Sequence, residues 1–201
     1  MDLTWADEHV NAIMQCWYPG AQGGNAIAQV LFGDACPEGR LPVTFYRTSE
    51  ELPEFTDYSM EGRTYRYMKN KPLYPFGFGL SYTGFTITPP VLEKQEREDK
   101  IGILCKVKNV GEVPGAEVVQ CYVETLCAPV VRPAKELIRF RKVFLQPGEE
   151  QKVKFTIDRK ELAFYGADME LIDGGIPLRI TVGNSSRAEA GDVSLQLDRR
   201  S

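Results

Sequence analysis

The chain has 201 residues, of which 43% are hydrophobic and 26% charged, and its formal net charge at pH 7 is −4. This composition is ordinary for a globular protein of one or two domains. The negative charge leaves no basic footprint for nucleic acid, and no apolar run approaches the roughly 20 residues that span a bilayer. We therefore expect neither nucleic acid nor a membrane as a partner.

Histidine and cysteine usage restricts the chemistry. A Ser-His-Asp or Cys-His arrangement would have to use His9, the single histidine, which lies in a charged stretch typical of a surface turn. The five cysteines show neither a CxxC pair nor zinc-type spacing, so we expect no metal and no cofactor.

The cysteines also bear on location. Their odd number favours reduced, buried thiols over disulfides, and the first residues lack the basic and apolar regions of a signal peptide. We expect a cytoplasmic rather than a secreted protein. A glycosylation sequon at residues 184–186 carries no weight, because such triplets are common by chance.

Residues 1–45 have the pattern of an α/β layer. A short helical turn begins near Thr4 as N-cap, and residues 12–18 form an apolar run of strand length that Pro-Gly ends. Residues 26–32 carry a helical apolar stripe, with a glycine following as C-cap. Residues 41–45 are typical of an edge strand, because a proline cannot donate to a ladder.

These elements do not amount to a whole domain. Two strands and one helix cannot cover both faces of an α/β sheet, so we interpret residues 1–45 as the C-terminal fragment of an α/β sandwich domain. Trp17 and Tyr18 end the first predicted strand, where ligands gather in open α/β sheets. They could stack on a sugar ring as substrate-binding residues, or they could simply pack into a core.

Residues 46–84 are interpreted as a connector. They hold a cluster of acids, and paired carboxylates could serve a glycosidase, but nothing in the sequence supplies a cleft around them. We expect Arg63 and Arg66 to pair with these acids and assign no catalytic residue. Residues 72–85 combine five aromatic residues with prolines and glycines, which predicts an ordered seam pinned by its rings to the parts on either side.

From residue 85 to residue 201 the pattern is of strands only. Apolar and polar residues alternate at 101–108, 119–123, 153–157, 178–182 and 193–197, with weaker segments at 86–92 and 137–145. Turn signals separate these segments. About seven short strands over this length predict an immunoglobulin-like or fibronectin-type-III-like β-sandwich. The fold class is thus mixed, a partial α/β sandwich segment followed by an all-β sandwich.

Several blocks of the sequence resemble the C-terminal part of family 3 glycoside hydrolases, the β-glucosidase and β-xylosidase group. WYPGAQGGNAIAQVLFGD at 17–34 and PEGRLPVTF at 37–45 look like the end of that family's α/β sandwich domain. GRTYRY at 62–67 and LYPFGFGLSYT at 73–83 look like its connector. The fibronectin-type-III-like domain is matched by VKNVG at 107–111, GAEVVQCYV at 115–123, RPAKEL at 132–137, VFLQPGE at 143–149 and VGNSS at 182–186.

The resemblance implies a parent that hydrolyses β-linked sugars by a retaining two-carboxylate mechanism. It also implies that the catalytic barrel and the acid/base glutamate lie outside this sequence, so the chain itself would be structural or accessory. Its partner would be the rest of the glycosidase, in cis or in trans, with carbohydrate as a possible ligand. Two alternatives stay open, a free-standing carbohydrate- or protein-binding module and the accessory chain of a split glycosidase.

Overall fold

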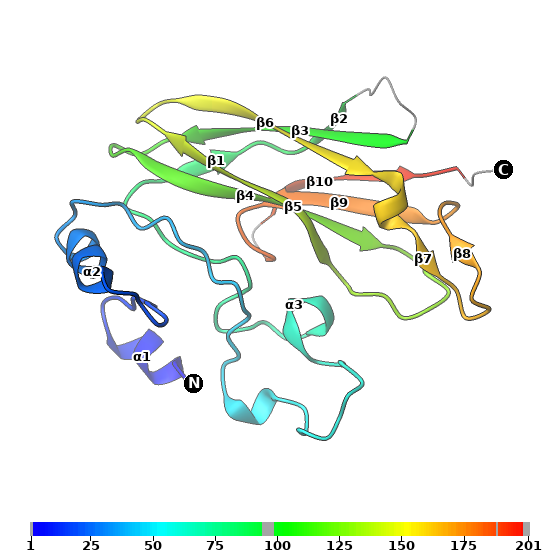
Figure 1. Ribbon diagram of the computed structural model, residues 1–201, viewed down its shortest axis with the longest axis horizontal. Coiled ribbons are helices and arrows are strands. Elements are labelled where there is room, and N and C mark those ends of the chain that lie inside the picture. The colour runs from blue at the N-terminus through cyan, green and yellow to red at the C-terminus, as the bar shows by residue number, and fades with distance from the viewer. Residues whose placement is uncertain (1, 94–98, 188, 199–201) are drawn as a thin grey trace.

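The computed structural model describes residues 2–93, 99–187 and 189–198. Figure 1 shows two parts, a β-sandwich and a run of short helices and irregular chain that lies along one side of it. The first part of the chain, with its two helices, lies at one end of the molecule. No helix in the described ranges is long and apolar enough to cross a membrane.

The sandwich consists of two antiparallel sheets. In the described residues, β3 lies at the centre of one sheet and β4 and β9 at the centre of the other. The first sheet contains β1 (Phe85–Ile87), β2 (Val91–Glu93), β3 (Lys100–Asn109) and β6 (Glu150–Asp158). The second has the order β10 (Glu189–Gln196), β9 (Pro177–Gly183), β4 (Gly115–Thr125) and β5 (Glu136–Leu145). A short 3-10 helix, η2 (Arg159–Leu162), and the hairpin of β7 (Phe164–Tyr165) and β8 (Leu171–Ile172) close one end.

The two sheets enclose a dry core made by the alternating residues of their strands. Ile103, Val107, Val119, Leu145 and Ile180 have no exposed surface, as period-two burial requires when two sheets face each other. The predicted sandwich is therefore confirmed. The weakly predicted strand at 86–92 is in fact two short strands, since Pro89 and Pro90 separate β1 from β2 and cannot donate to a ladder. The last residues of the predicted range, 199–201, lie outside the described residues.

The predicted strands of the first 45 residues do not form. Residues 12–18 carry no strand, and residues 41–45 contribute one isolated bridge between Phe45 and Tyr74. A strand needs a neighbour to satisfy its backbone groups, and no strand of the described chain runs beside residues 12–18. The predicted helix is present as α2 (Gly23–Leu31), with Gly33 just beyond its end at a φ of +83°.

The first helical turn forms with a different start. It is α1 (Thr4–His9), and its N-cap is Leu3 rather than Thr4. Thr4 lies inside the helix, where its hydroxyl donates to the carbonyl of Arg47 at 2.5 Å instead of capping. The cap prediction was therefore wrong, because a more distant acceptor took the side chain.

The connector holds two short helices, η1 (Ser49–Glu51) and α3 (Thr64–Tyr67). Its aromatic seam packs on the sandwich as expected. Phe76 stacks on Tyr65 with ring centroids 4.4 Å apart, and Tyr65 meets the buried Tyr122 of β4 edge-on at 5.9 Å. On the other side Tyr74 contacts Phe45 at 6.1 Å. The seam is therefore ordered by rings on both of its neighbours.

Candidate functional site

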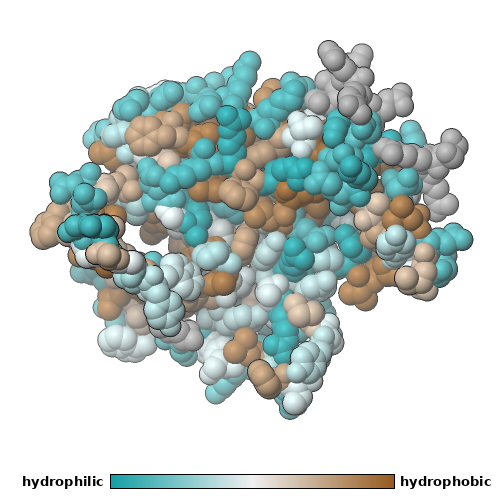
Figure 2. Space-filling model, in the orientation of Figure 1, coloured by the Kyte–Doolittle hydropathy of each residue, from teal (hydrophilic) through white to brown (hydrophobic). Residues whose placement is uncertain are grey.

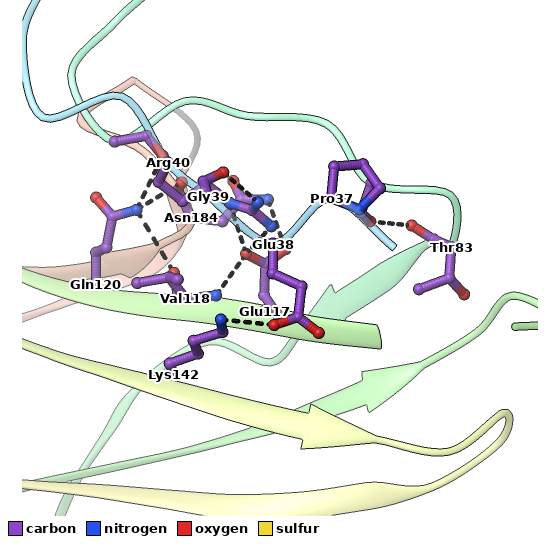
Figure 3. A network of polar contacts seen from close by, with 12 residues as sticks. Pro37, Glu38, Gly39, Arg40, Thr83, Glu117, Val118, Gln120, Lys142 and Asn184 are labelled. Atoms are coloured by element: carbon purple, nitrogen blue, oxygen red, sulfur yellow. Dashed lines mark hydrogen bonds and ion pairs between the residues drawn. The ribbon is translucent and has the colours of Figure 1, made fainter. Parts of the chain in front are cut away.

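A buried ion pair joins the N-terminal part of the chain to the sandwich. Arg40, in the irregular chain after α2, reaches Glu117 at the start of β4 (Figure 3). Its Nη2 and Nε atoms donate to the same carboxylate oxygen at 2.7 and 3.2 Å. The two side chains are only 6% and 3% exposed. We call the contacts around this pair the polar junction, consisting of Arg40, Gly77, Glu117, Gln120 and Asn184.

Glu117 is occupied on both of its oxygens. The backbone N–H of Val118 donates to Oε1 at 2.7 Å, and the side-chain amide of Asn184 donates to Oε2 at 3.3 Å. The carboxylate thus accepts four hydrogen bonds and is almost fully buried, so it is poorly accessible to a substrate. Glu117 is therefore suited to holding segments together rather than to acid/base catalysis.

Gln120 extends the junction to the seam and to the loop after β9. Its amide nitrogen donates to the carbonyls of Gly77 at 3.1 Å and Asn184 at 2.7 Å. Its oxygen accepts the hydroxyl of Tyr122 at 2.5 Å. Burial raises the pKa of the Tyr122 phenol, so it remains a donor at every physiological pH. One buried amide thus links three segments far apart in sequence.

The contact between Gly77 and Gln120 explains the first of the seam glycines. Gly77 has a φ of +81°, and a Cβ there would lie 2.1 Å from the Gln120 side-chain oxygen. Only glycine combines this backbone conformation with so close an approach. Gly79 is similar, because a Cβ there would lie 2.6 Å from the carbonyl oxygen of Gly39. The glycines of the seam therefore permit it to lie directly on the junction.

The glycosylation triplet lies inside this junction. The Asn184 amide donates to Glu117, and Ser185 and Ser186 are 3% and 5% exposed. Asn184 itself is half-buried, and its amide is engaged by Glu117 beside two covered serines, so it is not an open surface acceptor for a glycan. In the folded chain the triplet is a structural element of the junction.

The sugar-stacking candidates lie away from the junction. Trp17 is 49% exposed, has a φ of +51°, and its ring lies 6.4 Å from that of Phe45. Tyr18 is fully exposed. Neither residue lines the cavity beside β5 or the one beside Glu61. Both side chains are thus accessible to solvent, and their role toward sugar stays a prediction.

The acids of the connector are solvated, and they do not form the ion pairs with Arg63 and Arg66 that the sequence predicted. Arg63 donates to the backbone carbonyls of Glu54 and Asp57 at 2.7 and 2.8 Å, and Arg66 approaches Glu136 of β5 at 3.5 Å. The prediction of arginine–carboxylate pairs within the connector was therefore wrong. Arginine has several donors, and here they satisfy backbone carbonyls or an acid of the sandwich.

Two further observations describe these acids. Glu61 pairs with Lys69 at 2.9 Å, with both side chains mostly in solvent. Hydrogen bonds from Ser59, with a smaller effect of Arg63, hold the pKa of Asp57 below its usual value. A general acid would need the opposite shift. Among the described residues, no group of three or more His, Cys, Asp or Glu could hold a metal ion.

All five cysteines are free thiols, and two of them are buried in the sandwich core. Burial raises the pKa of Cys105 to about 11 and that of Cys121 to about 12. Cys16 and Cys36 are half-buried and Cys127 is exposed. The expectation of reduced thiols agrees with the structure, whereas burial applies to only two of the five.

Sequence reasoning missed the polar junction, although a signal was present. Glu117 and Gln120 interrupt the apolar run of residues 116–123. A charged residue amid buried neighbours is rare unless it is paired. That pattern predicts a buried partner for Glu117, but nothing local indicates that the partner is Arg40, 77 residues earlier.

These features define a class of protein, a fibronectin-type-III-like sandwich fastened to the preceding segment by a buried ion pair and an aromatic seam. Residues 1–82 match the glycosyl hydrolase family 3 C-terminal domain, and residues 117–186 match the fibronectin type III-like domain. The chain belongs to the family 3 glycosyl hydrolases, as a segment from their C-terminal part.

Curated relatives agree with this family. The chain is 37% identical to a periplasmic beta-glucosidase of Salmonella typhimurium over 208 residues, covering 96% of this chain and 27% of the relative. It is 40% identical to a xylan 1,4-beta-xylosidase of Xylanibacter ruminicola, covering 80% of this chain and 18% of that protein. The chain thus spans about a quarter or less of these relatives.

Solved structures give the same result. A beta-glucosidase from Kluyveromyces marxianus superposes with a TM-score of 0.87 at 32% identity, covering 98% of this chain and 25% of that one. A mutant beta-glucosidase from Listeria innocua in complex with laminaribiose superposes with a TM-score of 0.83 at 28% identity, covering 99% of this chain and 29% of that one. The sandwich, seam and N-terminal segment therefore occur together inside larger enzymes.

Proposed function

We propose that this chain is the C-terminal part of a β-glycosidase that hydrolyses O-glycosidic bonds of glucosides or xylosides. Its own task is structural, to fasten the end of the α/β domain to the sandwich. The observation that carries the proposal is the polar junction, in which Arg40 and Glu117 join the two parts at 2.7 Å away from solvent. The relatives, a beta-glucosidase and a xylan 1,4-beta-xylosidase, supply the reaction class.

The rest of the glycosidase is the expected partner. Several large apolar side chains of residues 2–45 are exposed, and exposed apolar groups that lie together mark contact with another protein surface. They include Trp5, Ile13, Trp17, Leu31 and Phe32. Burial against the remaining α/β domain and barrel would remove these groups from water. Within that assembly Trp17 and Tyr18 would either face the sugar or complete the packing.

The chain alone is proposed to be inactive. Retaining hydrolysis requires two carboxyl groups about 5–5.5 Å apart across one sugar ring, one of them kept protonated. The described acids of the connector are solvated, with Glu61 paired to Lys69 at 2.9 Å. The buried Glu117 accepts hydrogen bonds from Arg40, Val118 and Asn184 and is only 3% exposed.

A chimera tests the proposal. The matching region of the Salmonella beta-glucosidase, to which the chain is 37% identical, is replaced by this chain, and turnover of aryl β-glucoside is measured. We expect an active chimera, loss of activity when Glu117→Lys disrupts the junction, and retained activity for the exposed control Lys69→Glu. An inactive but folded chimera would contradict the structural role.

The isolated chain provides the second arm of the test. It is incubated with aryl β-glucoside and aryl β-xyloside, and no turnover is expected. Turnover abolished by Glu61→Gln would contradict the proposal and place an active site in the connector. Solution mass with and without a barrel-bearing partner separates the alternatives, because a stable complex indicates a split enzyme and an unchanged monomer a free-standing module.

A further inference from the structure

A cavity of about 270 Å³ lies in the sandwich, apart from the polar junction and from the apolar surface of residues 2–45. It is formed where the end of β4, the beginning of β5 and the helix η2 meet. Its lining consists of Val123, Thr125, Arg132, Glu136, Leu137, Ile138, Arg139, Glu161 and Leu162. Figure 2 shows apolar surface bordered by hydrophilic surface in the middle of this face, where Figure 1 labels β5.

The cavity coincides with an irregularity in β5, the last strand of its sheet. Cys121 pairs with Arg139 and the next residue, Tyr122, pairs with Leu137, so Ile138 is an extra residue in the ladder. Bulges of this kind bend an edge strand and re-aim its side chains, and they are common beside binding sites. Here the bulged residue and both of its neighbours line the cavity.

The charges of the lining cancel. Arg132 pairs with Glu136 at 2.9 Å, and Arg139 pairs with Glu161 at 2.5 Å. Two cations and two anions therefore surround the space, and an ion entering it would meet its own sign as well as the opposite one. The electrostatics favour a neutral ligand that both accepts and donates hydrogen bonds.

One donor of this lining is without a partner in the described chain. The Nε–H of Arg132 is buried and has no acceptor, although the same guanidinium donates to Glu136 and lies 4.7 Å from the ring centroid of Phe164. Unsatisfied buried donors are rare in folded proteins and call for a ligand or an ordered water. An oxygen atom of a ligand in the cavity would supply the acceptor.

The remaining wall is aliphatic, contributed by Val123, Leu137, Ile138 and Leu162. A pyranose ring has an apolar C–H face and an edge of hydroxyl groups, which match an aliphatic wall facing paired arginines and carboxylates. The volume is slightly below the roughly 300–1,000 Å³ of sites for drug-sized ligands, which suits one ring rather than a long chain.

We propose that this cavity is an accessory site that binds a single neutral sugar unit. The proposal goes beyond the proposed function, because it needs neither a barrel nor an acid/base residue. It gives the sandwich a ligand of its own, in addition to its role in fastening the segments together.

The test is a titration of the full chain, labelled with ¹⁵N, with D-glucose and separately with D-xylose. We expect saturable amide shifts that cluster at Val123, Thr125, residues 136–139 and residues 161–162. Inorganic phosphate and glucose 6-phosphate are titrated in parallel, and we expect them to produce weaker shifts or none. The experiment requires no hydrolysis, so its failure leaves the proposed function untouched.

Three variants sharpen the result. Arg132→Lys keeps a cation opposite Glu136 but removes the Nε–H, and we expect sugar affinity about fivefold to tenfold lower, as for one lost hydrogen bond. Ile138→Trp fills the cavity at its partly exposed bulge and should abolish binding. The control Arg141→Lys lies on the same strand, exposed and outside the lining, and should leave the affinity unchanged.

Several outcomes would overturn the proposal. They are the absence of saturable shifts up to the solubility limit of both sugars, shifts that Arg132→Lys and Ile138→Trp leave unchanged, and tighter binding of phosphate than of sugar. Tighter binding of phosphate would show that the site binds an anion. The absence of saturable shifts would mean that the Nε–H of Arg132 donates to water instead of a sugar. The dispersion of the amide spectrum shows whether each variant is folded.

Discussion

The sandwich and the first 45 residues differ in what surrounds their apolar side chains. In the sandwich, sixteen buried residues form one core cluster between the two sheets. In residues 2–45 no apolar residue is buried, although helix α2 carries an apolar stripe and Leu31 is 64% exposed. A periodic apolar pattern thus stabilises a fold only where a second layer faces it. The sandwich contains both of its layers, whereas the N-terminal segment contains one.

The polar junction shows how such a one-layered segment is nevertheless held in place. Buried contacts to β4 come through Arg40, the ring of Tyr65 and Gly77 of the seam, not through a shared apolar core. Paired charges and stacked rings have defined geometry, so they fix an orientation with little buried area. The two regions are therefore joined specifically while one of them remains open to a further partner.

The largest expected difference is in folding, between a fragment that contains the sandwich and one that contains only the N-terminal segment. A chain of residues 85–198 should unfold in one cooperative transition, because its two sheets cover each other, whereas residues 2–45 alone should stay unfolded. The fragment should be less stable than the full chain, since Tyr122 loses its ring contact with Tyr65 and Gln120 loses its hydrogen bond to Gly77. Urea unfolding followed by far-UV circular dichroism measures both effects.

Tryptophan emission offers an internal check, because both tryptophans, Trp5 and Trp17, lie in the N-terminal segment and are 68% and 49% exposed. In the full chain their emission should change little while the circular dichroism signal of the sandwich is lost. A large cooperative change in tryptophan emission, coincident with the loss of the strand signal, would show that residues 2–45 are covered in solution. It would contradict the difference drawn between the open N-terminal segment and the closed sandwich.

A pair of leucines compares the regions residue by residue. Leu145 has no exposed surface and Leu31 is 64% exposed. Leu145→Ala should lower the free energy of unfolding by about 2–5 kcal/mol through lost burial and a cavity, and Leu31→Ala by less than about 0.5 kcal/mol. Denaturant melts of both variants test this, and similar losses would mean that α2 is packed against something.

Breaking the Arg40–Glu117 pair of the polar junction should cause the next largest loss in the free energy of unfolding. Arg40→Met leaves Glu117 buried without its cation, and we expect a loss of about 3 kcal/mol, at the low end for a broken buried pair. Val118 and Asn184 still donate to the carboxylate, which limits the cost. The matched control Lys69→Met breaks a pair whose side chains are 83% and 74% exposed and should cost less than about 1 kcal/mol. Equal effects would mean that the junction is open to water.

The smallest expected effect is the loss of folding stability on acidification that comes from Asp158. The side chain of Lys100, helped by the Lys160 backbone, holds the pKa of Asp158 at about 2, below its ordinary value of 3.8. A depressed folded-state pKa contributes stability that is present above pH 4 and is lost as the pH falls toward 2. Asp158→Asn should therefore flatten this part of the stability profile. Urea melts at pH 5, 4, 3 and 2 and constant ionic strength measure it, and an unchanged slope would exclude Asp158 as its source.

Local signals in the sequence determined the sandwich strands, the helix before Gly33 and the aromatic seam. Each depends on neighbours within a few residues, such as alternation in β3 or a glycine free to adopt a positive φ. The resemblance of several blocks to the family 3 enzymes could also be found from the sequence, because it depends only on the order of residues.

Tertiary structure alone decided the remaining features. Residues 12–18 have the composition of a strand but no neighbouring strand to pair with. Arg63 binds a backbone carbonyl and Arg66 binds an acid of the sandwich, and no spacing rule in the sequence indicates either partner. The Arg40–Glu117 pair and the cavity beside Ile138 join residues that are close only after the sheets form. The physical reason is the same throughout, because hydrogen bonds and burial depend on which groups meet in space, and a single sequence records only which groups are available.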